Sequence, residues 1–344
     1  MTEPVRDSEL IIVENEKDEQ KRKVIYHLGL RPEQLARQIF VVGDPKRADL
    51  VAMKFDTVEY MVQNREFVTR TGTYQGMPVT VMSTGIGTDN NEIAVVESYG
   101  LNEFDLETRI RKTDALPLTI IRLGTSGGPQ RDIECGTLAI SSYALGLDNT
   151  GLFYDVAAAD ETVLNIETNA YHIITAATPL ECRFRGKIHP YASKATPEVV
   201  DALIKHAQEQ DVRYAVGITA SASGFFGPQG REIPGLPVTV PRLQEYLAAL
   251  CVNGNRIISL GESAEISKEA GIGEDSLVVT NFEMESSLLF HLATQLSYKV
   301  GTICPIIANR PKGTFLEDYS EAVDKCIDVG LGAMLELYQK DQAK

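Results

Sequence analysis

The sequence of 344 residues contains no tryptophan, only five histidines and five cysteines, and fewer basic than acidic residues. Its 33 lysines and arginines against 48 acidic residues give a formal charge of −15. Because binding to a phosphate backbone or an anionic membrane rests on clustered basic side chains, this deficit argues against both partners. The cysteines form no C-x-x-C pair and the histidines show no metal-ligand spacing, so neither disulfides nor a zinc site is expected.

Long apolar runs are missing as well. No segment approaches the roughly 18 apolar residues that a membrane-spanning helix needs. The first twenty residues carry charge throughout and contain no hydrophobic segment of a secretory signal. We therefore expect a cytoplasmic globular protein, with residues 1–23 as a mobile N-terminal arm and residues 24–344 as a single domain.

Apolar runs typical of strands alternate along this domain with segments typical of helices. Strands are expected over 39–42, 58–62, 67–74, 79–83, 118–123, 137–143, 214–220, 277–280 and 300–308, and helices over 46–55, 92–101, 197–210, 286–296 and 319–338. This alternation predicts an α/β fold. The stretches 145–196 and 233–275 carry the least periodic signal, and we expect them to be long insertions.

Two segments that follow strand-like runs are suited to an anion. In open α/β sheets, ligands bind at the carboxyl ends of the strands. The first segment is residues 43–47. Its glycine, the helix start that follows and Arg47 suit a phosphate, although a plain strand–helix turn can have the same residues. In the second, Arg122 lies near the end of an apolar strand, where its burial is costly unless an anion pairs with it. Thr125 and the glycine-flanked amides that follow can cradle that anion.

Two further segments suit a base and a sugar. The segment 221–231 contains Phe225, Gln229 and Arg231, which can stack on a flat heterocycle and hydrogen-bond its edge, or belong to a surface loop. In the segment 281–286, two acids bracket a methionine and can hold sugar hydroxyls. Capping of the following helix explains these acids equally well.

Two other patterns carry less weight. Residues 124–128 fit the G-x-S-x-G nucleophile elbow of serine hydrolases, but that elbow must lead straight into a helix, and here Pro129 and another strand follow. The run 85–87 lacks the third glycine of a dinucleotide fingerprint, since Asn90 occupies that place.

Six pieces of the chain, taken in order, resemble the nucleoside phosphorylase family and, within it, the pyrimidine branch. They are Tyr26-His27-Leu28-Gly29-Leu30, Gly43-Asp44-Pro45-Lys46-Arg47, Arg65-Glu66-Phe67, Ser83-Thr84-Gly85-Ile86-Gly87, Arg122-Leu123-Gly124-Thr125-Ser126-Gly127 and Asn281-Phe282-Glu283-Met284-Glu285-Ser286. The resemblance implies a central mixed sheet flanked by helices. It also implies reversible phosphorolysis of uridine to uracil and ribose 1-phosphate, with bound phosphate attacking C1′ directly and no organic cofactor.

The same resemblance assigns roles to individual residues. It places phosphate at Gly43, Arg47, Arg122 and Thr125, with Arg65 from a neighbouring subunit. It places ribose at Met284 and Glu285, with Glu283 nearby and the neighbour's His27, and uracil at Phe225, Gln229, Arg231, Ile307 and Ala308, with Arg310 behind the base. Arg122, Glu285 and Arg231 would carry the catalysis, and Glu66, Ile86 and Asn90 would lie near a cation at a dimer interface. A homo-oligomer of at least two subunits that share active sites is implied.

The chain also departs from the family's pattern. The family's Pro-Gly-Gln-Glu-Arg appears here as Gly227-Pro228-Gln229-Gly230-Arg231, which leaves the path of this loop open. A purine enzyme of the same family is the nearest alternative, but such enzymes carry an aspartate where Asn309 stands here. A nucleoside hydrolase, which has no use for phosphate-facing arginines, and an inactive nucleoside-binding protein are the others.

Overall fold

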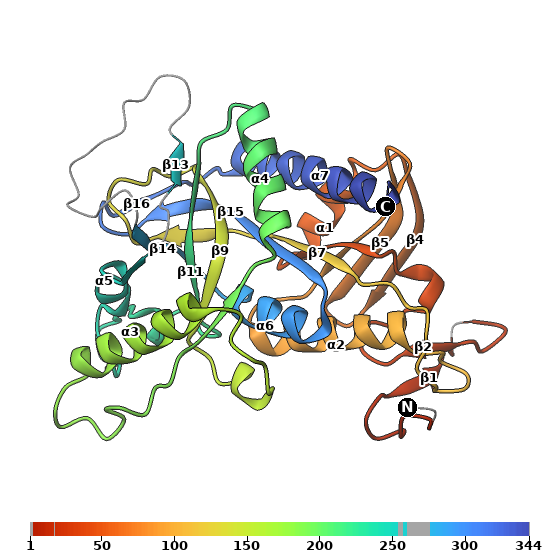
Figure 1. The fold of residues 1–344 in the computed structure, drawn as a ribbon, viewed down its shortest axis with the longest axis horizontal. Coiled ribbons are helices and arrows are strands. Elements are labelled where there is room, and N and C mark those ends of the chain that lie inside the picture. Colours follow the sequence, from red (N-terminus) through yellow and green to blue (C-terminus); the bar gives the residue numbers. More distant parts are fainter. Residues whose placement is uncertain (1–2, 17, 254–256, 260–275, 344) are drawn as a thin grey trace.

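A computed structural model describes residues 3–16, 18–253, 257–259 and 276–343 of the chain, which form a mixed sheet with helices on both sides (Figure 1). The strands are β1 (Ile12–Glu14), β2 (Lys23–Ile25), β3 (Gln38–Val42), β4 (Thr57–Asn64), β5 (Phe67–Tyr74), β6 (Met77–Ser83), β7 (Thr119–Leu123), β8 (Ser126–Gly128), β9 (Leu138–Gly146), β10 (Tyr191–Lys194), β11 (Tyr214–Ser221), β12 (Cys251–Asn253), β13 (Ile257–Ser259), β14 (Ser276–Glu283), β15 (Lys299–Asn309) and β16 (Thr314–Phe315). The helices are α1 (Pro45–Ala52), α2 (Thr88–Glu103), α3 (Glu161–Ala177), α4 (Pro197–Glu209), α5 (Leu243–Ala248), α6 (Ser286–Leu296) and α7 (Ser320–Gln342).

The strands and helices expected from the sequence are present, with ends that differ by a few residues. Local side chains set some of these ends. The carboxylate of Asp44 accepts a hydrogen bond of 2.9 Å from the backbone N–H of Lys46, so α1 begins at Pro45, immediately after this cap. The predicted α/β fold with a central mixed sheet is confirmed.

The sheet order is β10-β9-β11-β14-β8-β15-β7-β3-β6-β5-β4. Because β9 also pairs with β15, the five strands β9, β11, β14, β8 and β15 form a closed ring of paired strands. Parallel pairing brings the strand ends together. Arg122 on β7 is in register with Val41 on β3 and with Thr302 on β15, and Ser221 on β11 is in register with Glu283 on β14. The carboxyl ends of these strands therefore meet at one edge of the sheet, where ligands bind in α/β folds.

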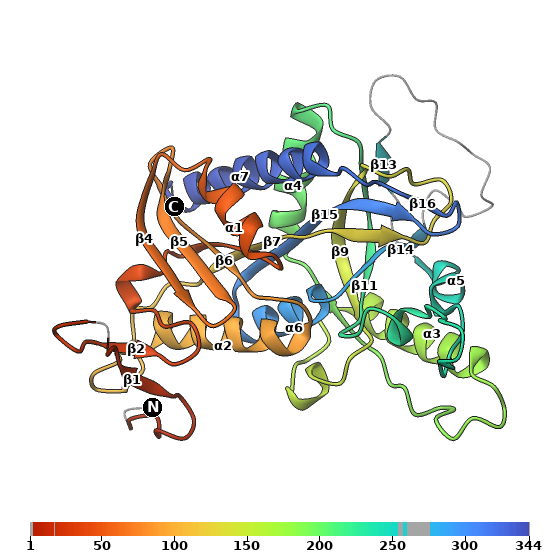
Figure 2. The same ribbon diagram turned by 180° about the vertical axis from the view of Figure 1, so that it is seen from behind.

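Helices cover the sheet on both sides. Helices α1, α4 and α7 lie along one side and α2 and α6 along the other (Figures 1 and 2). The larger core cluster packs these helices on the central strands, with Phe40 and Phe290 among its fully buried side chains. A second cluster lies beneath α3 and α5 and includes Val163, Ile166 and Phe282.

The first predicted insertion, 145–196, is not irregular. It contains α3, whose start is capped by Asp160 through a 3.0 Å bond from the N–H of Val163, and strand β10. The buried residues of α3 are Val163, Ile166, Ala170 and Ile174. Their spacing of three and four is a helical signal that the sequence carried and our prediction missed. The second predicted insertion, 233–275, contributes α5, and much of it lies outside the described residues.

The first 23 residues, predicted as a mobile arm, make defined contacts in the described part. Strand β1 pairs antiparallel with β2, and Leu10 is buried in the larger core cluster. The guanidinium of Arg109 donates to the backbone carbonyl of Val5 at 2.9 Å. The arm's mobility stays a prediction, as does the domain boundary at residue 24, which falls within β2. Over the described residues, no helix is both long enough and apolar enough to cross a membrane.

Candidate active site

A cavity of about 470 Å³ opens where β3, β7, β14 and β15 end. It is lined by Gly43, Asp44, Pro45, Arg47, Ile86, Arg122, Thr125, Ser126, Gly127, Phe225, Gln229, Arg231, Phe282, Glu283, Met284, Glu285, Ile307, Ala308, Arg310 and Phe315. The structure thus brings into one cavity the residues expected at phosphate and uracil, apart from Arg65, and those expected at ribose, apart from His27. Phe315, on the short strand β16, is a lining residue that the sequence reasoning did not find, because β16 forms only by pairing with β15.

One part of the cavity lining holds the two buried arginines Arg47 and Arg122. Arg47 extends from α1, and its Nη1 donates to the carbonyl of Leu123 at 3.3 Å. Burial, and secondly the charge of Arg122, lower the pKa of Arg47. An anion bound between these side chains and Thr125 would offset that cost, which makes this part of the lining suited to phosphate.

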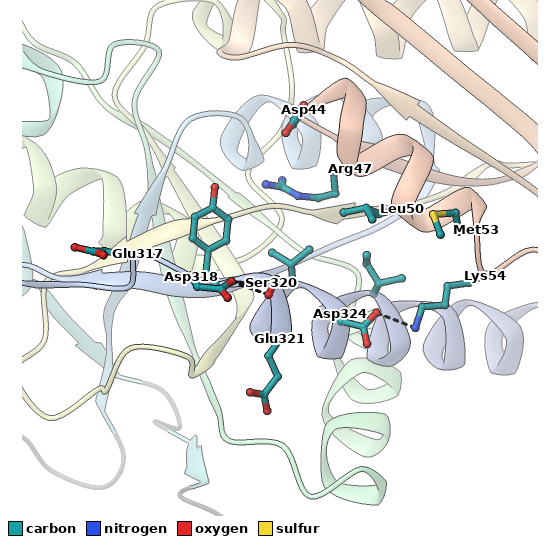
Figure 3. A pocket seen from close by; sticks show the side chains of 13 residues that line it. Asp44, Arg47, Leu50, Met53, Lys54, Glu317, Asp318, Ser320, Glu321 and Asp324 are labelled. Carbon is teal, nitrogen blue, oxygen red and sulfur yellow. Dashed lines mark hydrogen bonds and ion pairs between the residues drawn. The ribbon is translucent and has the colours of Figure 1, made fainter.

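Arg47 also lines a second hollow of about 670 Å³ between α1 and the first turns of α7 (Figure 3). Among the charged side chains that line this hollow, five are acidic and two, Arg47 and Lys54, are basic, and one of the acids, Asp324, pairs with Lys54 at 2.8 Å. Negative charge on the rim does not favour an anion there. The first cavity is therefore better suited to an anion at Arg47 than this hollow is.

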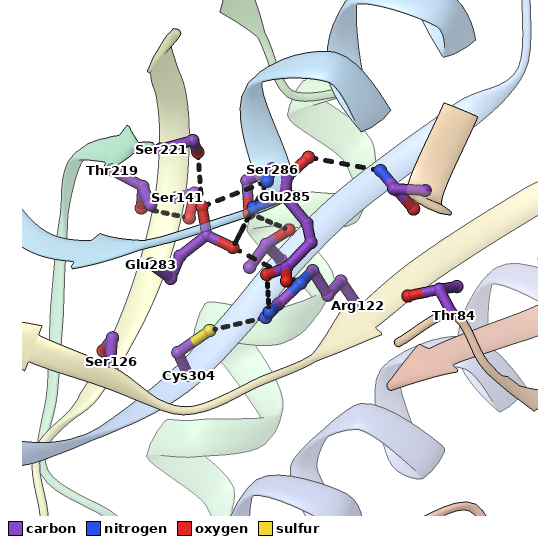
Figure 4. Close-up of polar contacts among 12 residues, drawn as sticks. Thr84, Arg122, Ser126, Ser141, Thr219, Ser221, Glu283, Glu285, Ser286 and Cys304 are labelled. Carbon is purple, nitrogen blue, oxygen red and sulfur yellow. Dashed lines mark hydrogen bonds and ion pairs between the residues drawn. The ribbon is translucent and has the colours of Figure 1, made fainter. Parts of the chain in front are cut away.

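Two carboxylates, those of Glu283 and Glu285, contact the guanidinium of Arg122 (Figure 4). Its Nη2 donates to Glu285, and its Nε lies 3.3 Å from Oε2 of Glu283. A third contact reaches the thiol of Cys304, whose sulfur lies 3.3 Å from Nη1 of Arg122. Burial by itself would lower the pKa of Arg122, but the two carboxylates raise it, so the guanidinium is firmly charged.

Glu283 caps helix α6 from the end of β14. Its carboxylate accepts from the N–H of Ser286 and the N–H of Glu285, each at 3.0 Å, and from the hydroxyl of Ser221. Of the two acids of this segment, Glu283 is therefore the one whose side chain caps the start of α6. The sequence assigns no role to Ser221, because its contact with Glu283 depends on the register between β11 and β14.

Glu285 has fewer bonds than Glu283 and also lines the cavity. Its Oε1 accepts from the N–H of Gly87 at 2.8 Å, while Oε2 accepts from Arg122. Burial, against the charge of Arg122, raises the pKa of Glu285, and the neighbouring charge of Glu283 raises it further. A carboxylate fixed in this way can accept hydrogen bonds from sugar hydroxyls.

Another part of the cavity lining presents a carboxamide and two guanidinium groups. Arg310 donates through Nη2 to the Oε1 of Gln229, and the guanidinium of Arg231 lies 4.1 Å from the ring centre of Phe225. Nε of Arg231 and Nε and Nη1 of Arg310 are buried without a hydrogen-bond partner. Burial lowers the pKa of Arg310, as does the charge of Arg231. This part of the lining is therefore cationic and rich in free donors, and it is suited to carbonyl oxygens that gain negative charge.

The loop 227–231 follows a path that its altered sequence makes possible. Residues 227–229 form a 3₁₀ turn, and Gly230 has a φ of +67°. A Cβ at this position would lie 2.1 Å from the backbone nitrogen of Leu243, so only glycine fits here. Gly230 thus lets Gln229 and Arg231 both line the cavity despite the departure from the family's pattern.

The residues assigned to a neighbouring subunit lie outside this cavity. His27 pairs through Nδ1 with Glu97 at 2.7 Å, and Arg65, exposed in the turn between β4 and β5, donates to the hydroxyl of Tyr26 at 3.1 Å. Their role at the site of another subunit stays a prediction.

The three residues expected near a cation lie in neighbouring segments, because the hydroxyl of Ser83 donates to the backbone carbonyl of Glu66 at 3.0 Å, and Ile86 and Asn90 follow Ser83 along the chain. Glu66 is exposed in the β4–β5 turn, Ile86 is exposed at the cavity, and Asn90 lies in the first turn of α2. Among the residues that the structure describes, no group of three His, Cys, Asp or Glu side chains could hold a metal ion. Whether a cation binds between subunits stays a prediction.

The geometry does not support the nucleophile elbow. Residues 126–128 form strand β8, whereas an elbow leads into a helix. Ser126 is buried, and its hydroxyl donates to the carbonyl of Pro305 at 3.3 Å. The described residues that line this cavity include no histidine to activate a serine.

Residues 37–336 match the family model of the phosphorylase superfamily. A uridine phosphorylase of Thermococcus kodakarensis is 29% identical over 303 residues, which are 88% of this chain and 84% of the relative. A uridine phosphorylase of Treponema pallidum is 27% identical, over 93% of this chain and 96% of the relative. The crystal structure of a Trypanosoma brucei nucleoside phosphorylase that shows uridine phosphorylase activity is 31% identical. It superposes with a TM-score of 0.76, over 91% of this chain and 97% of that one.

The family model spans most of the chain, from β3 to α7, and so includes every strand end that forms the cavity. The sequence match to the family model and the structural match to the Trypanosoma brucei enzyme therefore indicate the same family. We conclude that this chain belongs to the phosphorylase superfamily.

Proposed function

We propose that the enzyme catalyses the reversible phosphorolysis of uridine to uracil and ribose 1-phosphate. The observation that carries this proposal is the set of groups that line one cavity: the buried arginines Arg47 and Arg122, the carboxylate of Glu285, and a carboxamide with guanidinium groups. The similarity to uridine phosphorylases supports the choice of substrate. The residue types are those needed for an anionic nucleophile, a sugar and a pyrimidine.

The chemistry follows from the charges along the cavity. An oxygen of phosphate, held by Arg47, Arg122 and Thr125, forms a bond to C1′ as the C1′–N1 bond breaks. The electron pair of the C1′–N1 bond passes to the uracil ring, whose oxygens become negative and accept hydrogen bonds from Gln229 and Arg231. The uracil anion then takes up the proton that the phosphate gives up, directly or through water. No organic cofactor is needed, because phosphate is both the nucleophile and the counter-charge for the cationic sugar.

Glu285 fixes the sugar between the phosphate and the base. Its carboxylate is held by the N–H of Gly87 and by Arg122, so its position is set before substrate binds. Accepting bonds from the ribose hydroxyls places C1′ over the phosphate, which lowers the entropic part of the barrier. Met284 lines the cavity beside it.

The direct test is phosphate-dependent loss of uridine, measured beside inosine and thymidine. We expect uridine to be cleaved only when phosphate is present, with ribose 1-phosphate as the product. Cleavage of uridine without phosphate would instead identify a nucleoside hydrolase, and cleavage of inosine alone would identify a purine enzyme. Binding without turnover of any of the three would identify an inactive nucleoside-binding protein.

The purine alternative is disfavoured by Asn309. Its amide nitrogen donates to the backbone carbonyls of Gln130 at 3.0 Å and Ile133 at 2.8 Å, and the side chain is fully buried. An amide bound in this way serves the backbone and has no acidic proton for a purine nitrogen.

Replacing Arg231 by alanine is expected to weaken uracil binding by about 1.5–3 kcal/mol, the range for a hydrogen bond to a charged group. In free energy this corresponds to roughly a tenfold to hundredfold higher dissociation constant. Titration calorimetry with uracil measures the change. Phosphate affinity is the internal control and should not change, since the neighbours of Arg231 are Phe225 and Arg310 and not Arg47 or Arg122. Unchanged uracil affinity would remove Arg231 from the base site.

We further propose that the site is shared between subunits of a homo-oligomer, with His27 reaching the ribose and Arg65 the phosphate of a neighbour. Charge balance supports this proposal. Arg47 and Arg122 are offset by Glu283 and Glu285, so the phosphate site has no net positive charge of its own. A third arginine supplied from outside would favour a dianion.

Mixing two inactive variants tests the shared site. Arg65→Ala and Arg122→Ala subunits should each be inactive alone. Co-expressed, they should regain phosphate-dependent activity, because a mixed oligomer has one site with both arginines intact. If the mixture stays as inactive as its components, each site is built from one chain.

We propose that a cation binds at this subunit interface. The carboxylate of Glu66, the backbone carbonyl of Ile86 and the amide oxygen of Asn90 are oxygen ligands of the kind that hard cations prefer. Such an ion would have a structural role, because the exposed Glu66 is not among the residues that line the cavity.

A further inference from the structure

We propose that Cys304 is a positioning residue that orients the guanidinium of Arg122 for phosphate. This inference rests on the proposed phosphate role of Arg122. Cys304 is fully buried on β15, and its sulfur lies 3.3 Å from Nη1 of Arg122 (Figure 4). The parallel register of β15 with β7, which pairs Thr302 with Arg122, places the thiol beside the end of β7.

The contact completes the support of the guanidinium. An arginine has five N–H donors in one plane. Glu285 takes one on Nη2, Glu283 lies against Nε, and Cys304 takes one on Nη1. One N–H on each terminal nitrogen remains for a ligand. The two carboxylates hold only the Nε and Nη2 edge, so without the sulfur the plane is free to tilt about that edge.

The backbone of Gly124 passes close to both the Nη1 of Arg122 and the sulfur of Cys304. A Cβ at Gly124 would lie 1.5 Å from Nη1 of Arg122 and 2.6 Å from the sulfur of Cys304. The chain therefore passes so close to both groups that only glycine fits. This tight packing, observed independently of the hydrogen bond, confines Nη1 between the backbone and the thiol.

A neutral acceptor suits this position. Burial is the main cause that raises the pKa of the Cys304 thiol, to about 12, so the sulfur is uncharged at physiological pH. It orients the arginine without adding a third negative charge beside Glu283 and Glu285. An anionic acceptor at the same place would compete with phosphate for Arg122.

The test is the affinity of the full-length protein for inorganic phosphate, measured by titration calorimetry, together with the KM values for phosphate and uridine. Cys304→Ala should lower phosphate affinity by about threefold to tenfold, as expected for one lost weak hydrogen bond. The KM for uridine and the affinity for uracil should not change. Cys304→Ser, which keeps an acceptor, should restore phosphate affinity. The matched control is Cys326→Ala, which removes a buried thiol whose sulfur contacts the carbonyl of Ile303 at 3.5 Å.

Three results would overturn the proposal: wild-type phosphate affinity in Cys304→Ala, an equal loss in Cys326→Ala, or a parallel loss of uracil and phosphate affinity with a lower Tm. Absence of phosphate binding to the wild-type protein would refute it too. Because calorimetry reads phosphate binding without turnover, failure of the proposed uridine activity is distinguishable from failure of this inference.

Discussion

Arg122→Ala should lower kcat/KM for phosphate-dependent cleavage of uridine by about 10³-fold or more. Loss of one preorganised donor at a reacting oxygen already costs roughly 10²–10³-fold in other enzymes. Here the loss is larger, because Arg122 also neutralises Glu283 and Glu285. Without it, the phosphate would meet two unpaired carboxylates. Steady-state kinetics with varied phosphate measure the effect.

The same substitution should also destabilise the fold. Breaking a buried ion pair by removing one partner costs about 3–5 kcal/mol, since a buried charge is left uncompensated. Thermal unfolding must therefore accompany the kinetics. Arg122→Lys keeps the charge and should fold better than the alanine variant, yet it cannot bridge both carboxylates and the phosphate with one ammonium group. A well-folded Arg122→Ala protein with a normal KM for phosphate would exclude Arg122 from the phosphate site.

Glu285→Gln should lower kcat by about 10²-fold, in the range of other groups that orient a substrate, without weakening phosphate binding. The neutral amide is a weaker acceptor for ribose hydroxyls and no longer pairs as an ion with Arg122. Freed from one carboxylate, Arg122 should bind phosphate as tightly as before or more tightly. This opposite response of kcat and phosphate affinity distinguishes Glu285 from the phosphate ligands. Parallel losses in both quantities would assign Glu285 to phosphate binding instead.

The pH dependence of the reaction should report the same residue. Burial raises the pKa of Glu285 above its usual value of 4.5, so its ionised form is lost on acidification at a higher pH than for an exposed glutamate. If the ionised form orients ribose, wild-type kcat should fall as the pH drops through this raised pKa. The Glu285→Gln variant should lack that acid limb. An identical limb in both proteins would point to another group.

The fold was predictable where local signals are strong. The apolar run before Gly124 and the run after Lys299 became the adjacent buried strands β7 and β15. Helix α3 was missed although its buried residues have helical spacing. The reason is that these few apolar positions lie among many polar ones, in a long segment whose periodic signal is weak as a whole. The short strand β16 had no local signal, since it exists only through its pairing with β15.

The candidate site divides in the same way. Sequence alone determined which residue types follow the strands, and therefore that arginines, an acid pair and an amide–guanidinium pair would meet where parallel strands end. Only the tertiary structure decided what each side chain does there. It engages Glu283 as a helix cap, engages Asn309 with backbone carbonyls, and sets the thiol of Cys304 against Arg122. The physical reason is that motifs report order along the chain, whereas these contacts depend on the register between strands far apart in sequence, and a shift of one residue would turn each side chain to the opposite face.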